Sequence, residues 1–154
     1  MDVKVHERRA GRVLLLDRDG RVLLFRGCDP RHPDDKFWFT AGGGVEPGED
    51  DARAACRELA EETGIPVAPA DLTGPVHETT EEFWYDGRRY RQRQVFFLLR
   101  RDAPTIDMSG LRADEVGVMD RFAWWSAEEL RATREVYYPV ELPDVLDGLP
   151  CSPH

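Results

Sequence analysis

The sequence has few cysteines and no long apolar run. Its three cysteines, Cys28, Cys56 and Cys151, form an odd number at unrelated spacings, which argues against a disulfide framework and favours a reduced protein. The longest apolar run, around Val95 to Leu99, is as long as a strand and much shorter than a membrane span. The N-terminus lacks the apolar segment of a signal peptide. We therefore expect a cytoplasmic protein that does not interact with a membrane.

Positive charge is also scarce. The 21 basic residues stand against 30 acidic ones, so the net charge is −9, which argues against binding to DNA through a basic surface. Lysine occurs only at Lys4 and Lys36, and the excess of arginine fits either phosphate binding or genome composition. A phosphate ligand is still compatible with this charge, because a bound metal ion reverses the local sign. We expect one domain over residues 1–154, as a monomer or homodimer.

The apolar pattern predicts two hairpins and several further strands. We expect strands over residues 12–16, 21–26, 37–39, 76–85, 90–99 and 121–125. Asp-Gly pairs at residues 19–20 and 86–87 mark the two hairpin turns. Residues 28–35 contain two prolines and several charges, and residues 101–119 are polar, so we expect both segments to be loops.

Three helices are expected between and after these strands. The first begins after Asp50, a suitable N-cap, and ends at Gly64. The second opens with a capping box at Ser126, and the third covers residues 142–149 with Pro143 in its first turn. The order of strands, helix, strands and helices predicts an α/β layered domain with a mixed sheet.

In the first helix, apolar and acidic residues occupy neighbouring faces. The apolar stripe consists of Ala52, Cys56, Leu59 and Thr63. Glu58, Glu61 and Glu62 follow the i, i+3, i+4 spacing of one face. Carboxylates this close repel one another unless a cation binds them, and a hard divalent ion prefers oxygen ligands. We expect the apolar side of the helix to pack on the sheet and the acidic side to open to a cleft.

A fixed spacing connects Gly43, Glu49 and the run Arg57-Glu58-Leu59-Ala60-Glu61-Glu62-Thr63-Gly64-Ile65. Over these residues the sequence resembles the Nudix hydrolase signature G-x5-E-x7-R-E-U-x-E-E-x-G-U, in which U is aliphatic. The resemblance extends over roughly residues 10–132. It implies a Nudix-like α/β/α sandwich with a mixed sheet. It also implies hydrolysis, with Mg²⁺ or Mn²⁺, of a diphosphate bond in a nucleoside diphosphate linked to another group. Ala41 is a departure, because many family members have proline before the glycines.

The resemblance implies roles for the acidic residues and for the glycine run. Glu58 and Glu62 are expected to be direct metal ligands, and Glu61 a ligand or a general base. A backbone carbonyl of the glycine run, with Gly43 as the candidate, is expected to complete the metal shell.

Further charged residues are expected to assist these ligands. Arg57 lies beside the acids and is expected to orient a carboxylate by pairing with Glu49. A carboxylate from a distant loop often acts as the base in this family, and Glu115 is the first candidate, with Asp114 and Asp120 as rivals. The remaining alternatives lie on a predicted strand: Glu78, Glu81 and Glu82.

Candidate substrate-binding residues are arginines and aromatic side chains. Arg26 ends a predicted strand near the expected cleft. Arg89, Arg91 and Arg93 share one face of another strand, where they form either a phosphate-binding row or a charged edge that prevents aggregation. The aromatic candidates for stacking on a base, which fit a hydrophobic core equally well, are Trp38, Phe83, Trp84, Trp124 and Trp125.

The leading prediction is a metal-dependent hydrolase that acts on a small nucleoside diphosphate derivative. One alternative is a non-catalytic nucleotide-binding sensor with the same fold, and another is an acidic protein-interaction domain. The intact acidic set argues against the sensor. The sequence does not decide among oxidised nucleotides, ADP-ribose, nucleotide sugars, dinucleoside polyphosphates and capped RNA ends.

Overall fold

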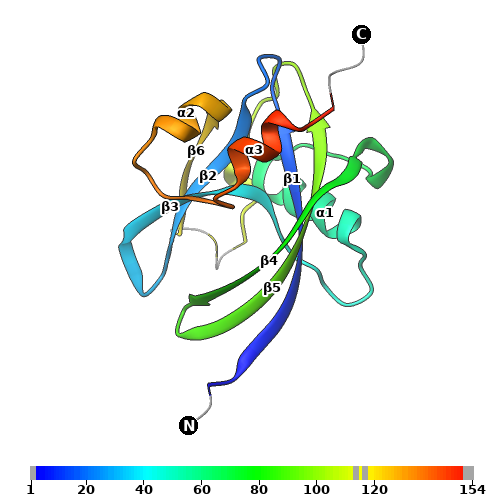
Figure 1. Ribbon diagram of the computed structural model, residues 1–154. Helices are drawn as coiled ribbons and strands as arrows, with labels where there is room; N and C mark the ends of the chain where they lie inside the picture. The colour runs from blue at the N-terminus through cyan, green and yellow to red at the C-terminus, as the bar shows by residue number, and fades with distance from the viewer. Residues whose placement is uncertain (1–2, 113–114, 116–117, 151–154) are drawn as a thin grey trace.

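A mixed sheet forms the middle of the molecule, with helices on both sides (Figure 1). The computed structural model describes residues 3–112, 115 and 118–150. The strands within these ranges are β1 (Val5–Leu16), β2 (Val22–Asp29), β3 (His32–Gly44), β4 (Thr73–Tyr85), β5 (Arg88–Arg100), β6 (Met119–Trp125) and β7 (Tyr137–Tyr138). The helices are α1 (Asp51–Thr63), α2 (Ala127–Ala132) and α3 (Leu142–Asp147), with the short 3-10 turns η1 (Pro69–Asp71) and η2 (Met108–Gly110).

The strand order places the glycine run beside β1. The sheet runs β4-β5-β1-β2-β3-β7, and β6 pairs with β2. β1 is parallel to β5 and antiparallel to β3. β3 pairs with β2 through its first part and with β1 through residues 41–44. The run Gly42–Gly44 therefore lies where β3 changes neighbours.

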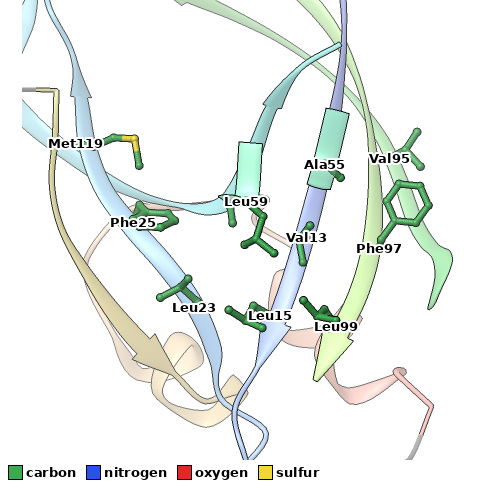
Figure 2. Packing of buried hydrophobic residues seen from close by; sticks show 11 residues of the cluster. Val13, Leu15, Leu23, Phe25, Ala55, Leu59, Val95, Phe97, Leu99 and Met119 are labelled. Carbon is green, nitrogen blue, oxygen red and sulfur yellow. The ribbon is translucent and has the colours of Figure 1, made fainter. Parts of the chain in front are cut away.

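Alternating side chains of β1 enter two hydrophobic clusters on opposite faces of the sheet. Val13 packs in the cluster beneath α1 with Leu59 of that helix (Figure 2). Leu14 packs in the second cluster with Leu130 of α2 and Leu142 of α3. Full burial of each such side chain contributes about 1.5–3 kcal/mol. This layering, with α1 on one face and α2 and α3 on the other, confirms the predicted α/β/α sandwich.

Helix α1 begins and ends where the sequence predicts. The carboxylate of Asp50 accepts a hydrogen bond from the backbone N–H of Arg53 at 2.8 Å. Gly64 has φ 76°, a left-handed conformation that favours glycine, and donates its N–H to the carbonyl of Ala60 at 2.9 Å. These two caps fix the register of the acidic residues between them.

The structure differs from the expectation in two segments. Residues 28–35, predicted as a loop, instead end β2 and begin β3, so that only Pro30 and Arg31 form the turn. The charged residues that begin β3 are exposed to water, so their polarity does not oppose strand formation. Strand β7 was not predicted, because two residues carry no periodic signal. No helix among the described residues is both long and apolar enough to cross a membrane.

Candidate active site

One cleft of about 630 Å³ is bordered by α1 and by most strands of the sheet. Its lining includes Arg8 and Arg12 of β1, the glycine run of β3, and Glu58 and Glu62 of α1. Strands β4 and β7, the two ends of the sheet order, also contribute side chains. The sheet therefore curls until both of its edges border the same cleft.

The glycine run allows two carboxylates of α1 to lie directly against β3. The backbone N–H of Gly42 donates to Oε1 of Glu62 at 2.8 Å. An ideal Cβ on Gly43 would lie 2.5 Å from Cδ of Glu58, so a side chain at this position would overlap that carboxylate. The acidic face borders the cleft, as predicted, but its carboxylates are largely shielded from water: Glu58 and Glu62 are each 1% exposed, while Glu61 is 26% exposed.

Burial makes the ionised forms of these carboxylates costly. Desolvation raises the pKa of Glu62 well above its ordinary value, although the Gly42 N–H and Arg12 act in the opposite direction. Desolvation also raises the pKa of Glu58, against the hydrogen bond from Arg57. A cation placed at these carboxylates would reverse this cost.

Three carboxylates meet in a geometry that fits a divalent cation. Ligand oxygens of Glu58, Glu61 and Glu115 all lie within 4.8 Å of one another. Oε2 of Glu58 and Oε2 of Glu61 are buried and accept no hydrogen bond from the described residues. Buried unpaired carboxylate oxygens are costly, and hard divalent ions prefer such oxygens as ligands. The donor set therefore suits Mg²⁺ or Mn²⁺.

The structure separates the three candidates for the additional carboxylate. It places Glu115 beside Glu58 and Glu61, as expected of the first candidate. Asp114 lies outside the described residues. Asp120 is instead bound by Arg26 through hydrogen bonds of 3.0 and 2.5 Å, which lower the pKa of Asp120.

The alternatives on β4 also have distinct positions. Glu81 and Glu82 line the cleft. The carboxylate of Glu82 is bound by two arginines of β5, whereas that of Glu78 accepts a hydrogen bond from Arg93 at 2.7 Å.

Arg57 connects the signature residues to one another. Its guanidinium donates to both oxygens of Glu49, at 2.7 and 3.0 Å, which confirms the predicted pair. It also donates to Oε1 of Glu58 at 2.9 Å and to the carbonyl of Gly44 at 2.9 Å. The hydrogen bonds between Arg57 and Glu49 lower the pKa of the Glu49 carboxyl and raise the pKa of the Arg57 guanidinium. Arg57 therefore holds a metal-ligand candidate and the glycine run in one arrangement.

Two arginines at the site were missed by the sequence analysis. Arg12 donates to Oε1 of Gln94 at 2.9 Å and to the carbonyls of Thr40 and Gly42. Burial lowers the pKa of Arg12, and Glu62 partly offsets this effect. Arg112 reaches the acidic cluster from the segment before β6. Arg12 begins an apolar run, Val13 to Leu16, and this position alone gave no signal that its side chain lies in the cleft.

The arginines predicted to bind substrate lie elsewhere. Arg89 binds Glu82, and Arg91 binds both Glu82 and Glu7. The described residues that line the cleft do not include Arg26, Arg89 or Arg91. The structure does not bring these three side chains to the cleft, and their contribution to substrate binding stays a prediction.

Aromatic side chains divide between the core and the cleft. Trp38 is 5% exposed and packs edge-on against Trp125, so these two belong to the core. Trp84 of β4 and Tyr138 of β7 line the cleft and are 56% and 43% exposed. Tyr138 is supported by an edge contact with Phe37 at 5.6 Å between ring centroids. The cleft thus has a carboxylate region and an exposed aromatic region.

The curled sheet and the carboxylate centre define an α/β protein with a site suited to a divalent ion. A family model described as the NUDIX domain matches residues 6–142. The chain therefore belongs to the Nudix hydrolases, a family that acts on phosphoanhydride bonds and generally uses divalent metal ions.

Two curated relatives support this assignment at the sequence level. The chain is 37% identical over 108 residues to a protein of Sphingopyxis alaskensis named RNA pyrophosphohydrolase, a match that covers 63% of this chain and 65% of that protein. It is 34% identical over 129 residues to a protein of the same name from Novosphingobium aromaticivorans, with 77% and 76% covered.

Solved structures agree on the fold. The crystal structure of the MutT protein from Methanosarcina mazei superimposes with a TM-score of 0.67 over 95% of this chain and 94% of that one. At 18% sequence identity, this likeness supports the fold alone.

Proposed function

We propose that this protein hydrolyses a diphosphate bond in a nucleoside diphosphate linked to another group, with a divalent metal ion. The observation that carries the proposal is the meeting of Glu58, Glu61 and Glu115, with two buried oxygens that lack hydrogen-bond donors among the described residues. Membership of the Nudix hydrolases supports the reaction class.

The carboxylates at the site have two proposed roles, binding the metal ion and accepting a proton from water. Glu58, Glu61 and Glu62 would hold the ion, which neutralises phosphate oxygens and makes a bound water more acidic. Glu115 lies at the same cluster and is our candidate for accepting the proton from the attacking water, with Glu61 as the second candidate. Arg57 fixes the orientation of Glu58 through its hydrogen bond and through its pair with Glu49.

Two observations support a nucleotide as the substrate. Exposed Trp84 and Tyr138 border the same cleft as the carboxylates, and aromatic faces stack on nucleobases. Relatives named RNA pyrophosphohydrolase favour RNA among the candidate substrates. The non-catalytic sensor gains no support, because the carboxylates of the signature are all present and two of them, Glu58 and Glu61, meet at one point.

A substrate panel with Mg²⁺ and Mn²⁺ tests the proposal. Nucleoside triphosphates, ADP-ribose, nucleotide sugars, dinucleoside polyphosphates and 5′-triphosphorylated RNA are incubated with the protein, and both products are identified by mass. We expect cleavage that excess EDTA abolishes. Glu61→Gln and Glu62→Gln should lower turnover at least about 100-fold, whereas Glu128→Gln, an exposed change on α2, should not. Binding of nucleotides without any release of product would contradict the proposal.

A further inference from the structure

The arginines on the strands beside the cleft differ in whether a carboxylate neutralises them. On β5, Arg89, Arg91 and Arg93 each pair with a glutamate. On β1, Arg9 pairs with Asp51 at 2.6 Å. Arg8 lines the cleft, is exposed, and makes no hydrogen bond or ion pair with any residue that the structure describes. Its positive charge is therefore available to a ligand in the cleft.

The guanidinium of Arg8 lies between an aromatic ring and the glycine run. Its Cζ lies 5.7 Å from the centroid of the Tyr90 ring, within the range of a cation–π interaction. An ideal Cβ on Gly44 would lie 2.6 Å from Nη2 of Arg8, so the guanidinium lies directly over this glycine. Neither contact uses the N–H groups of the guanidinium for a hydrogen bond, which leaves those donors for another partner.

The position of Arg8 relates directly to the carboxylate centre. Arg8 packs on Gly44, and the carboxylate of Glu58 packs on Gly43, the preceding residue of β3. Successive Cβ positions of a strand point to opposite faces, so the two side chains approach the glycine run from its two sides. The unpaired cation and the metal-ligand candidate therefore contact adjacent residues of one strand, and both border one cleft.

Arg12 provides a contrast on the same strand. Arg8 and Arg12 lie four residues apart on β1 and share a face. The donors of Arg12 are used by Gln94 and by two backbone carbonyls, so this residue supports the structure. The donors of Arg8, in contrast, make no hydrogen bond with the residues that the structure describes.

We propose that Arg8 binds the substrate's diphosphate through a non-bridging oxygen of the phosphate group that lies farther from the carboxylate centre. A guanidinium matches two phosphate oxygens with parallel N–H donors, which a lysine cannot reproduce. The ion at the carboxylates and Arg8 would then hold the two ends of one diphosphate. This assignment rests on the proposed function and identifies one of its substrate-binding residues.

The test compares Arg8→Gln with Arg9→Gln, the same change at the neighbouring residue that pairs with Asp51. Two probes are titrated calorimetrically with Mg²⁺: α,β-methylene-ADP, which cannot be hydrolysed, and inorganic pyrophosphate. A charged hydrogen bond is worth about 10- to 100-fold in affinity, so we expect Arg8→Gln to weaken both probes by that factor. Arg9→Gln should change them less than about twofold.

Kinetics with the best substrate of the panel provide a second readout. We expect Arg8→Gln to raise KM by a similar factor and to change kcat little, with Arg8→Lys intermediate. Because Arg8 is exposed, the melting temperatures of both variants should stay close to that of the wild-type protein. Equal affinities in Arg8→Gln and Arg9→Gln, or a fall in kcat at unchanged KM, would overturn the assignment. Failure of the wild-type protein to cleave any substrate would instead refute the proposed function.

Discussion

Nη2 of Arg112 lies 3.6 Å from Oε1 of Glu58, a carboxylate that is almost completely buried. The same guanidinium lies 3.3 Å from Oε1 of Glu115. A divalent ion held by Glu58 and Glu61 would lie beside the same carboxylates. Arg112 therefore competes with the ion for one region of negative potential.

Arg112→Gln should bind Mn²⁺ more tightly than the wild-type protein. Exposed ion pairs are worth up to about 1 kcal/mol, which corresponds to roughly fivefold in affinity. Calorimetric titration of the purified protein measures the change. Arg53→Gln, an exposed arginine of α1, removes the same charge as a control. Weaker binding in Arg112→Gln alone would show that Arg112 supports the ion rather than competing with it.

Gly43→Ala should disrupt the carboxylate centre. The added Cβ would overlap the carboxylate of Glu58, and overpacking of this kind costs about 1–3 kcal/mol of unfolding free energy. We also expect the variant to lose the rise in melting temperature that Mg²⁺ gives the wild-type protein. Gly148→Ala is the control, because a Cβ there meets its nearest atoms at 3.6 and 3.7 Å. A Mg²⁺ response equal to that of the wild-type protein would contradict the proposed role of the glycine run.

Glu49→Gln should lower stability in a pH-dependent way. Arg57 holds the folded-state pKa of Glu49 below its unfolded value, so the pair stabilises the protein above the unfolded pKa of about 4.3. This contribution is lost as the pH falls through the lower, folded pKa. At neutral pH we expect a deficit of about 1–2 kcal/mol for the lost charged hydrogen bonds. The deficit should shrink in denaturant titrations between pH 5 and pH 3. A deficit that is constant with pH would contradict the charge-based explanation.

The features predicted correctly from the sequence are those that depend on local spacing. One helical face determines that Glu58 and Glu61 lie together, and two caps determine where the helix begins and ends. The pair between Arg57 and Glu49 follows from the same family signature.

The features that were missed depend on contacts between strands that are distant in the sequence. Alternation on β5 puts Arg89 and Arg91 on one face, but their partners come from neighbouring strands, Glu82 from β4 and Glu7 from β1. Contacts with β3 and β5 likewise decide that the half-buried side chain of Arg12 points into the cleft. Such pairing reflects the sheet order, which no local pattern encodes.

Trp84→Ala should weaken nucleotide binding without affecting the phosphate region. Stacking of a base on an aromatic side chain is worth about 1–3 kcal/mol, or roughly 5- to 100-fold in affinity. We therefore expect weaker binding of α,β-methylene-ADP and unchanged binding of inorganic pyrophosphate, which has no base. Phe122→Ala is the matched control, because Phe122 is an exposed aromatic residue of β6 that does not line the cleft.

The two ligands separate the aromatic region from the phosphate region. Arg8→Gln is expected to weaken both ligands, whereas Trp84→Ala is expected to weaken only the one with a base. If Trp84→Ala leaves the nucleotide affinity unchanged, the base does not stack on β4. If it weakens pyrophosphate equally, the β4–β5 hairpin contributes to phosphate binding as well. That hairpin contacts the end of β2 through the hydrogen bond from the N–H of Asp86 to Asp29 at 3.1 Å.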